Sequence, residues 1–232
     1  MSSSTINRFS EKLLLALKIE QDSSELRLQL EGYDMAQLKK DLHNDENKTA
    51  FWVNIYNSYF LILRKERKME KPDIYKKKLF TIAGEQLSLD DVEHGILRKG
   101  QYKEGQAPEG KNLDVIKELM VETLDHRIHF ALNCGAKSCP PIAFYKAESI
   151  GSQLDMATQA FLEGESDFDD VAKEVHTTIL LDWFSSDFGG TEGIKELFKN
   201  QIEKDISDFT IKFKEYSWEE DLNNFASLSF KS

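Results

Sequence analysis

The segment from residue 125 to residue 142 constrains the fold most, because it contains both cysteines of the chain and two of its four prolines. Apolar residues alternate ahead of the first cysteine, at Ile128, Phe130 and Leu132. Alternation at every second position predicts a half-buried strand over residues 128–133. A polar loop then begins at Cys134-Gly135, and Pro140-Pro141 stiffens its exit. The sequence therefore predicts a cysteine at the end of a strand, next to a glycine.

A cysteine in such a place can act as a nucleophile. Gly135 permits backbone conformations that other residues avoid, so the N–H groups of Cys134 and Gly135 can converge on an oxyanion. The thiol needs a base or a cation beside it, because an ordinary cysteine is mostly protonated at neutral pH. Two alternatives remain open: Cys134 can be a buried structural residue, or it can form a redox pair with Cys139 across the four intervening residues. Structural support of the turn is the simplest role for Cys139.

His94, which precedes Cys134 by 40 residues, is the leading candidate for the base. The apolar positions around it predict a short helix over residues 89–98. Glu93 is the candidate that orients the imidazole, although adjacent side chains on a regular helix diverge by about 100°. Either the helix is irregular there, or Glu93 has another role. The structural alternative for His94 is a simple hydrogen-bonded histidine.

The same region raises the alternative of a zinc site formed by His126, His129, Cys134 and Cys139. Their spacing is not that of a standard zinc finger, and on a strand residues 126 and 129 face opposite ways. We therefore expect no metal and no cofactor.

Asn54 and Asn57 stand inside an otherwise apolar helix that the sequence predicts over residues 45–68. If these amides are buried, they must be hydrogen-bonded. Bracing of the backbone of an active-site loop would satisfy them.

Helical and strand patterns interleave along the chain, which predicts an α+β fold with a modest sheet packed by helices. We expect an N-terminal helical extension over residues 1–44 and an α+β domain over residues 45–232. A helix capped by Ser10 and a short strand through Leu26, Leu28 and Leu30 are predicted in the extension. Further helices are expected at 112–123, 149–164 and 191–202, strands at 175–181 and 206–213, a hairpin at Gly84-Glu85 and a surface loop at 99–111.

Charge and hydropathy exclude several classes of partner. A net charge of −11 and a pI near 5.0 argue against nucleic acid and anionic membranes, because like charges repel. No segment approaches the roughly 18 apolar residues of a membrane span. The leucines of residues 13–17 are too few for a signal-peptide core, so we expect a cytoplasmic protein of unknown oligomeric state.

Three segments resemble the domain of unknown function 547 family: residues 50–57, residues 87–98 and residues 127–141. The resemblance implies a fold similar to papain-like and transglutaminase-like cysteine enzymes. It also implies a catalytic set of Glu93, His94 and Cys134. The chain departs from the family pattern at Ile142-Ala143, where many members carry an arginine, and between Trp218 and Leu222, where the family motif is tighter.

These observations together predict a cysteine-dependent hydrolase or acyltransferase that acts on an amide or ester bond of a peptide or small molecule. Cys134 attacks, His94 takes its proton, and Glu93 orients the ring. Four residues are expected to bind substrate or support the site: Asn54, Asn133, Gly135 and His129. The rival is a non-catalytic module that binds a peptide or protein in the same cleft, and thiol reactivity would separate the two.

Overall fold

Helix α4 (Asp45–Leu61) is the centre of the fold, because every residue from Thr49 to Leu61 is buried. A helix that is apolar around its whole circumference belongs in a core rather than on a surface. Asn44 caps it by accepting a hydrogen bond from the Asn47 N–H, and the helix continues as a π-helix over Ile62–Glu66. The predicted helix over 45–68 is confirmed apart from its last two residues.

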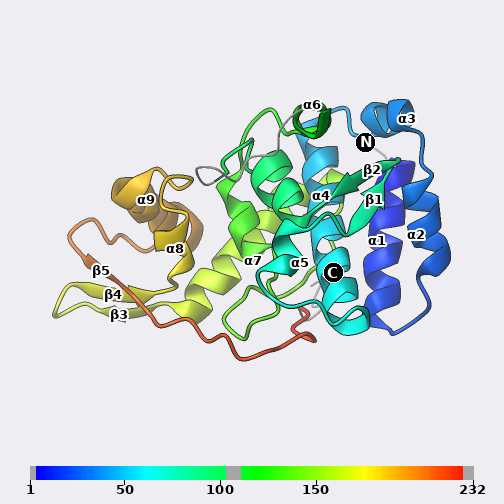
Figure 1. Ribbon diagram of the computed structural model, residues 1–232. Coiled ribbons are helices and arrows are strands. Elements are labelled where there is room, and N and C mark those ends of the chain that lie inside the picture. The colour runs from blue at the N-terminus through cyan, green and yellow to red at the C-terminus, as the bar shows by residue number, and fades with distance from the viewer. Residues whose placement is uncertain (1–3, 103–110, 227–232) are drawn as a thin grey trace.

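The structure is a computed structural model that describes residues 4–102 and 111–226 (Figure 1). Helices form most of it and two small sheets accompany them, so the predicted α+β class is confirmed. Within these residues no helix is long and apolar enough to cross a membrane. Residues 103–110, which make up most of the predicted loop at 99–111, lie outside the described part.

The N-terminal residues form three helices, α1 (Thr5–Lys18), α2 (Ser24–Glu31) and α3 (Met35–Asp41), and α1 packs along α4. The cap of α1 is Ser4 and not Ser10, so that prediction is wrong. Ser10 is buried inside α1, where its hydroxyl donates to the Asn7 carbonyl. The boundary at residue 44 stays a prediction.

The predicted strand through the three leucines is also wrong, since residues 24–31 are helix α2. Leu26 and Leu30 are four residues apart, so they share one face of a helix as well as one face of a strand. Leu28 decides between the two, because it is 68% exposed while Leu30 is fully buried.

Both sheets are small. Strands β1 (Phe80–Ile82) and β2 (Glu85–Leu87) form the predicted hairpin, with Ala83-Gly84 in the turn. Strand β3 (Asp167–Asp169) pairs antiparallel with β4 (Glu174–Thr177), and β4 pairs parallel with β5 (Thr210–Phe213). The strands predicted at 175–181 and 206–213 are thus shorter than expected, since α8 (Leu180–Trp183) interrupts the first.

The remaining helices include four that the sequence periodicity predicts. They are α5 (Asp73–Lys76), α6 (Lys111–Leu119), α7 (Ile150–Glu165), α9 (Gly190–Ile202), a π-helix over Asp91–Leu97 and a short 3-10 helix over Ala147–Ser149. The helices predicted at 89–98, 112–123, 149–164 and 191–202 are therefore present, with ends that shift by a few residues.

The strand predicted before Cys134 is wrong, because a 3-10 helix (His126–Phe130) occupies that position. Asp125 starts it by accepting a hydrogen bond from the Arg127 N–H at 3.0 Å. Ile128 and Phe130 are both buried, but in two different hydrophobic clusters. The alternation arises because the segment is buried on two sides. A strand and a tight helical turn between two cores produce the same apolar pattern.

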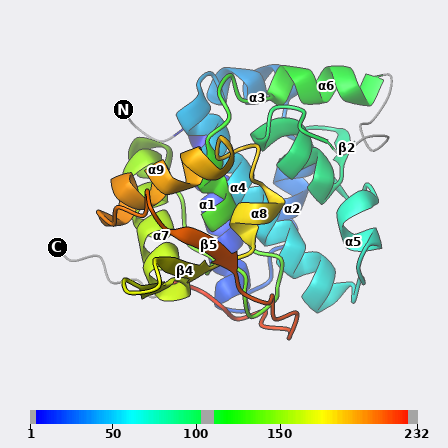
Figure 2. The same ribbon diagram turned by 90° about the vertical axis from the view of Figure 1, so that its left-hand side faces the viewer.

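Two hydrophobic cores flank this segment. The N-terminal core is built around α1, α4 and the hairpin, and includes Ile6, Leu13, Leu30, Leu38, Trp52, Ile55, Val92 and Ile96. The C-terminal core joins α7, α9 and the three-stranded sheet, and includes Phe130, Phe161, Leu181, Phe188, Leu197 and Phe198. Figure 2, viewed from the end that carries β4 and β5, shows these strands in front of α4. The chain after β5 returns to the cysteine loop through bridges at Ala136–Glu220 and Ile142–Phe225.

The helical assignment of residues 24–31 predicts unequal costs for two leucine substitutions. Leu30→Ala should lower the free energy of unfolding by about 2–5 kcal/mol, because it empties a buried site. Leu28→Ala should change it by less than about 0.5 kcal/mol, because its side chain is exposed. Urea unfolding of both variants measures the difference. A strand would place the two leucines on one face, so equal costs would contradict the helix.

Candidate functional site

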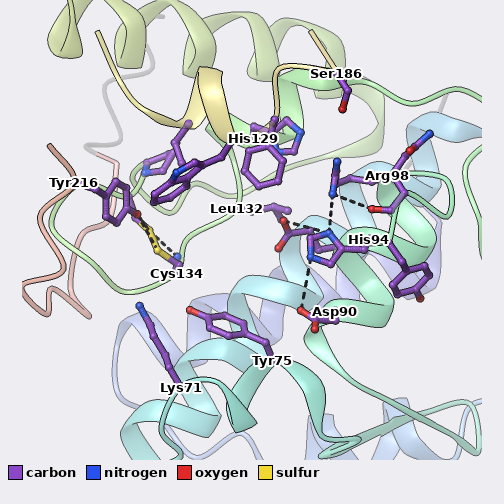
Figure 3. Close-up of a pocket in the computed structure, with 18 of the residues that line it drawn as sticks. Lys71, Tyr75, Asp90, His94, Arg98, His129, Leu132, Cys134, Ser186 and Tyr216 are labelled. Carbon is purple, nitrogen blue, oxygen red and sulfur yellow. Dashed lines mark hydrogen bonds and ion pairs between the residues drawn. A yellow bond between two sulfur atoms is a disulfide. The ribbon is translucent and has the colours of Figure 1, made fainter. Parts of the chain in front are cut away.

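A cavity of about 650 Å³ lies where the two cores meet. One wall comes from the π-helix, and the opposite wall comes from the cysteine loop and the segment after β5 (Figure 3). Four sequence candidates line it, three of them from the expected catalytic set, Glu93, His94 and Cys134. His129 also lines it, so the structure gathers residues from distant parts of the chain around one space.

The π-helix explains how two adjacent residues face the same cavity. The N–H of Arg98 donates to the carbonyl of Glu93, five residues earlier, at 2.8 Å. The helix is therefore irregular at Glu93, which is one of the two alternatives that the sequence left open. Such π-helical segments are frequent at functional sites. Glu93 Oε1 lies 3.7 Å from His94 Nδ1. Asp90, one turn before His94, lines the same wall.

Arg98 determines where the proton of His94 lies. Its guanidinium donates to His94 Nδ1 at 2.9 Å, and a guanidinium cannot accept a hydrogen bond. The Nδ1 atom must therefore be the acceptor, which places the proton of the neutral ring on Nε2. That N–H lies 3.8 Å from Asp90 Oδ1. In this arrangement His94 is a proton donor.

His129 has the opposite arrangement. Its Nε2 lies 2.8 Å from Asp187 Oδ2, which accepts the proton and leaves the lone pair on Nδ1. Burial lowers the pKa of His129, although the hydrogen bond with Asp187 opposes the shift, so the ring stays neutral. A neutral imidazole oriented by a carboxylate is the arrangement of a general base.

Asp187 binds His129 directly and is connected to His94 through Arg98. The guanidinium holds the carboxylate with two hydrogen bonds, from Nε at 2.6 Å and from a terminal nitrogen at 3.0 Å. Burial favours the protonated acid, but hydrogen bonds from His129 and Arg98 prevail and hold the pKa of Asp187 well below its usual range. Sequence reasoning assigned no role to Asp187 or Arg98, because their partners are distant in the chain.

The two cysteines form a disulfide in the opposite wall. The two cysteines therefore bridge each other, as the redox-pair alternative requires, and neither sulfur is a free thiol in this state. Cys134 is half-buried, whereas Cys139 is only 3% exposed. The Tyr216 hydroxyl lies 3.0 Å from the Cys134 sulfur and 2.9 Å from the Cys139 sulfur. Among the described residues no hydrogen bond joins Cys134 to His94, and Figure 3 shows them on different sides of the cavity.

Asn57 braces the loop that carries the cysteines. Its amide donates to the Ala131 carbonyl at 2.9 Å and accepts from the Asn133 N–H at 2.9 Å. Asn54 makes the same pair of bonds with the backbone of Tyr145. The prediction that these buried amides hydrogen-bond to loop backbone is confirmed.

The predicted oxyanion site is not available in this state. The Gly135 N–H donates to Asn133 Oδ1 at 2.7 Å, and the Cys134 N–H donates to the Cys139 sulfur at 2.9 Å. Gly135 has φ +72°, and a Cβ added there would meet the Phe60 ring at 2.7 Å. Its requirement for glycine therefore comes from a left-handed turn and close packing, not from anion binding.

Aromatic residues surround the disulfide on the open side of the cavity. Trp183, Tyr216 and Trp218 contact one another with ring centroids 4.6–5.9 Å apart. Both tryptophans are largely exposed, and the Lys71 ammonium lies 4.0 Å from the Trp218 ring centroid. Figure 3 shows Lys71 and Tyr75 pointing into the cavity on the side of Cys134. Flat, exposed aromatic faces of this kind bind apolar groups well.

A family model described as "Protein of unknown function, DUF547" matches residues 40–162, more than half of the chain. The chain belongs to the DUF547 family. No curated protein and no solved structure matches it in the other two comparisons. The DUF547 match contains both cysteines, Glu93, His94 and His129. It ends before Trp183, Asp187 and Tyr216. The residues that bind His129 and contact the disulfide sulfurs, Asp187 and Tyr216, therefore lie beyond the matched residues.

The four residues considered for zinc have other partners. His126 packs against Phe188, His129 binds Asp187, and the cysteines bind each other. Within residues 4–102 and 111–226, no group of three or more histidine, cysteine or acidic side chains is arranged to hold a metal ion.

The neutral state of His129 predicts a pH dependence of stability. Its folded pKa lies below the unfolded value of about 6.5, so the unfolded chain takes up a proton first as the pH falls. The free energy of unfolding should therefore decrease below about pH 6.5, by up to about 1.4 kcal/mol per pH unit. His129→Gln keeps a donor for Asp187 and should flatten the decrease between pH 7 and 5. Urea unfolding at each pH measures it.

The control is His43→Gln, which changes a surface histidine and should keep the decrease seen in the unmodified protein. An identical slope in His129→Gln and His43→Gln would contradict a neutral, buried His129.

Proposed function

We propose that the cavity is the active site of a cysteine-dependent hydrolase or acyltransferase that acts on amide or ester bonds when its disulfide is reduced. The observation that carries the proposal is the shared cavity, which Cys134, His94 and His129 all line. The proposal includes the expectation that the protein resembles papain-like and transglutaminase-like cysteine enzymes. Such enzymes need a thiol, an imidazole and a shielded cleft. Reduction of the disulfide would supply the thiol, and the histidines and the cavity supply the other two.

Cys134 is the nucleophile, because it is the more exposed of the two sulfurs. Tyr216 supports this role with a hydroxyl 3.0 Å from the sulfur. Burial, with a smaller effect of the Glu165 charge, raises the pKa of Tyr216, so its proton stays in place and can be donated to a thiolate. A hydrogen bond to the charged form lowers the pKa of a thiol.

The two histidines have different roles. The sequence assigned the base to His94, but the hydrogen bond from Arg98 occupies the lone pair on Nδ1. We assign the base to His129, whose Nδ1 is left unprotonated by the bond to Asp187 and which lines the same cavity as Cys134. His94 donates a hydrogen bond from its Nε2–H to the carbonyl oxygen of the substrate and keeps the proton. Glu93, 3.7 Å from His94 Nδ1, acts on this ring through its charge.

The reaction follows the usual course of acyl transfer. The Cys134 sulfur forms a bond to the carbonyl carbon, and its proton passes to His129. Lys71 and Tyr75, on the same side of the cavity, stabilise the oxyanion in place of the backbone N–H groups. The C–N or C–O bond then breaks as His129 returns the proton to the leaving group. Water or an amine releases the acyl group from sulfur.

The cavity suits a peptide or a small amide or ester with an apolar substituent. Its volume of about 650 Å³ lies within the range of small-molecule sites. The exposed faces of Trp183 and Trp218 would bind the apolar group beside Cys134. The rival proposal, a non-catalytic binding module, would use the same aromatic faces to bind a peptide or protein. The closed disulfide is compatible with it, because a purely structural pair of cysteines would form the same bond.

Alkylation of a single-thiol protein tests the nucleophile. Cys139→Ser leaves Cys134 as the sole cysteine. Its rate of reaction with iodoacetamide, measured from pH 5 to 10, should give a thiol pKa below the ordinary value of about 8.5. Adding Tyr216→Phe or His129→Gln should slow the reaction at pH 7 about three- to tenfold. Adding His94→Gln should change it less than twofold, because His94 holds no free lone pair.

Acylation provides the second measurement. The same protein, treated with p-nitrophenyl acetate, should gain one acetyl group on Cys134 in its intact mass, and Cys134→Ser should gain none. Two results together would favour the binding module. They are a thiol pKa of 8.5 or higher that is the same in the Tyr216→Phe, His129→Gln and His94→Gln variants, and the absence of an acetyl adduct.

A further inference from the structure

We propose that the Cys134–Cys139 disulfide is a thiol–disulfide exchange site with a fixed direction, in which a small external thiol attacks Cys134 and Cys139 leaves. The inference adds a redox activity to the cavity and does not depend on acyl transfer. It rests on the exposure of the two sulfurs, on their hydrogen bonds and on the scaffold of the loop between them.

Access to the two sulfurs is unequal. Both cysteines line the cavity, but Cys139 is only 3% exposed, whereas Cys134 is half-buried. An attacking thiolate must approach one sulfur along the S–S axis, from the side opposite the other. The rate of exchange depends on which sulfur is accessible. Cys134 is the sulfur that a thiol in the cavity can reach.

The buried sulfur is prepared as the leaving group. Cys139 Sγ accepts a hydrogen bond from the Cys134 N–H at 2.9 Å. Disulfide sulfurs carry no proton, so Tyr216 must be the donor to them, and its hydroxyl lies 2.9 Å from Cys139 and 3.0 Å from Cys134. Tyr216 can therefore donate to whichever sulfur becomes a thiolate, and the hydrogen bond from the Cys134 N–H is the one that distinguishes Cys139. Both hydrogen bonds strengthen when Cys139 becomes a thiolate, because bonds to an ionised acceptor are stronger than bonds to a neutral one. A leaving thiol with a lower pKa departs faster.

The loop is held in place independently of the S–S bond. The Lys137 N–H donates to the Glu219 carbonyl at 2.7 Å, and the Ser217 N–H donates to Ser138 Oγ at 3.0 Å. These contacts tie the residues between the cysteines to the segment after β5. The two sulfurs therefore stay near each other after reduction, so the pair can close again.

The exchange balances in two steps. A thiolate RS⁻ attacks Cys134, forms a mixed disulfide with it and displaces Cys139 as a thiolate. A second RS⁻ attacks the external sulfur of the mixed disulfide, which gives RSSR and releases Cys134 as a thiolate. Two external thiols are thereby oxidised by two electrons, and the disulfide of the protein is reduced. In reverse, the reduced protein converts RSSR into two thiols.

The experiment uses the full chain and glutathione as the probe. The oxidised protein is mixed with reduced glutathione, quenched with acid at short times and mapped by mass spectrometry. The transient mixed disulfide should lie on Cys134. With oxidised glutathione, Cys139→Ser should accumulate an adduct on Cys134, and Cys134→Ser should react at Cys139 at least tenfold more slowly.

Tyr216→Phe tests the leaving-group argument. It should slow reduction of the disulfide about three- to tenfold, because it removes one hydrogen bond to the departing thiolate. Tyr102→Phe is the matched control, since Tyr102 lines the same cavity and, among the described residues, its hydroxyl donates to Asp91 and not to sulfur. It should leave the rate within twofold of the unmodified protein. Thermal melts confirm that both variants are folded.

Three results would overturn the proposal: an adduct mainly on Cys139, equal rates at the two sulfurs, or reduction that requires denaturant. Equal effects of Tyr216→Phe and Tyr102→Phe would remove the role of Tyr216. None of these readouts involves an ester or amide. Exchange without an acetyl adduct would therefore refute acyl transfer alone, and an acetyl adduct without exchange would refute this inference alone.

Discussion

The ion pair between Arg98 and Asp187 is the contact on which the rest of the site depends. Arg98 ends the π-helix beside the N-terminal core, and Asp187 follows α8 beside the C-terminal core. Their side chains are 9% and 2% exposed and make two hydrogen bonds across 89 residues of chain. Removing one partner of a buried pair leaves an uncompensated charge and costs about 3–5 kcal/mol. The pair therefore connects the π-helix, which forms one wall of the cavity, to the segment after α8 through a contact that tolerates little change.

This pair also sets the chemistry of both histidines. Arg98 has donors left after binding Asp187, and one of them occupies His94 Nδ1. Asp187 has acceptor capacity left after binding Arg98, and His129 uses it. One histidine thereby becomes a fixed donor and the other a fixed acceptor, although the two rings differ little in isolation. Environments that give two similar titratable groups different proton-donor and proton-acceptor roles are typical of sites that perform acid–base chemistry.

Much of the site could be predicted from sequence because local patterns carried the information. Apolar periodicity located the helix that presents Glu93 and His94, and two amides inside an apolar helix pointed to a braced loop. The irregular helix at Glu93 was left open as an alternative, and it proved to be a π-helix. These features depend on residues within a few turns of one another.

What could not be predicted depends on long-range contacts. Tyr216 lies 82 residues from Cys134, and Asp187 lies 58 residues from His129. No local spacing marks such pairs. The alternation before Cys134 favoured a strand, yet burial between two cores produces the same pattern in a 3-10 helix. The disulfide was one of four possibilities for Cys134, and only the folded loop distinguishes them.

The positions of the imidazole protons test the central claim most directly. A long-range ¹H–¹⁵N correlation spectrum at pH 7.5 distinguishes Nδ1–H from Nε2–H tautomers, and the spectra of His94→Gln and His129→Gln assign the signals. Both rings should be neutral with the proton on Nε2, and Arg98→Gln should release His94 from that tautomer. A His94 ring protonated on Nδ1, or an imidazolium at His129, would contradict the account.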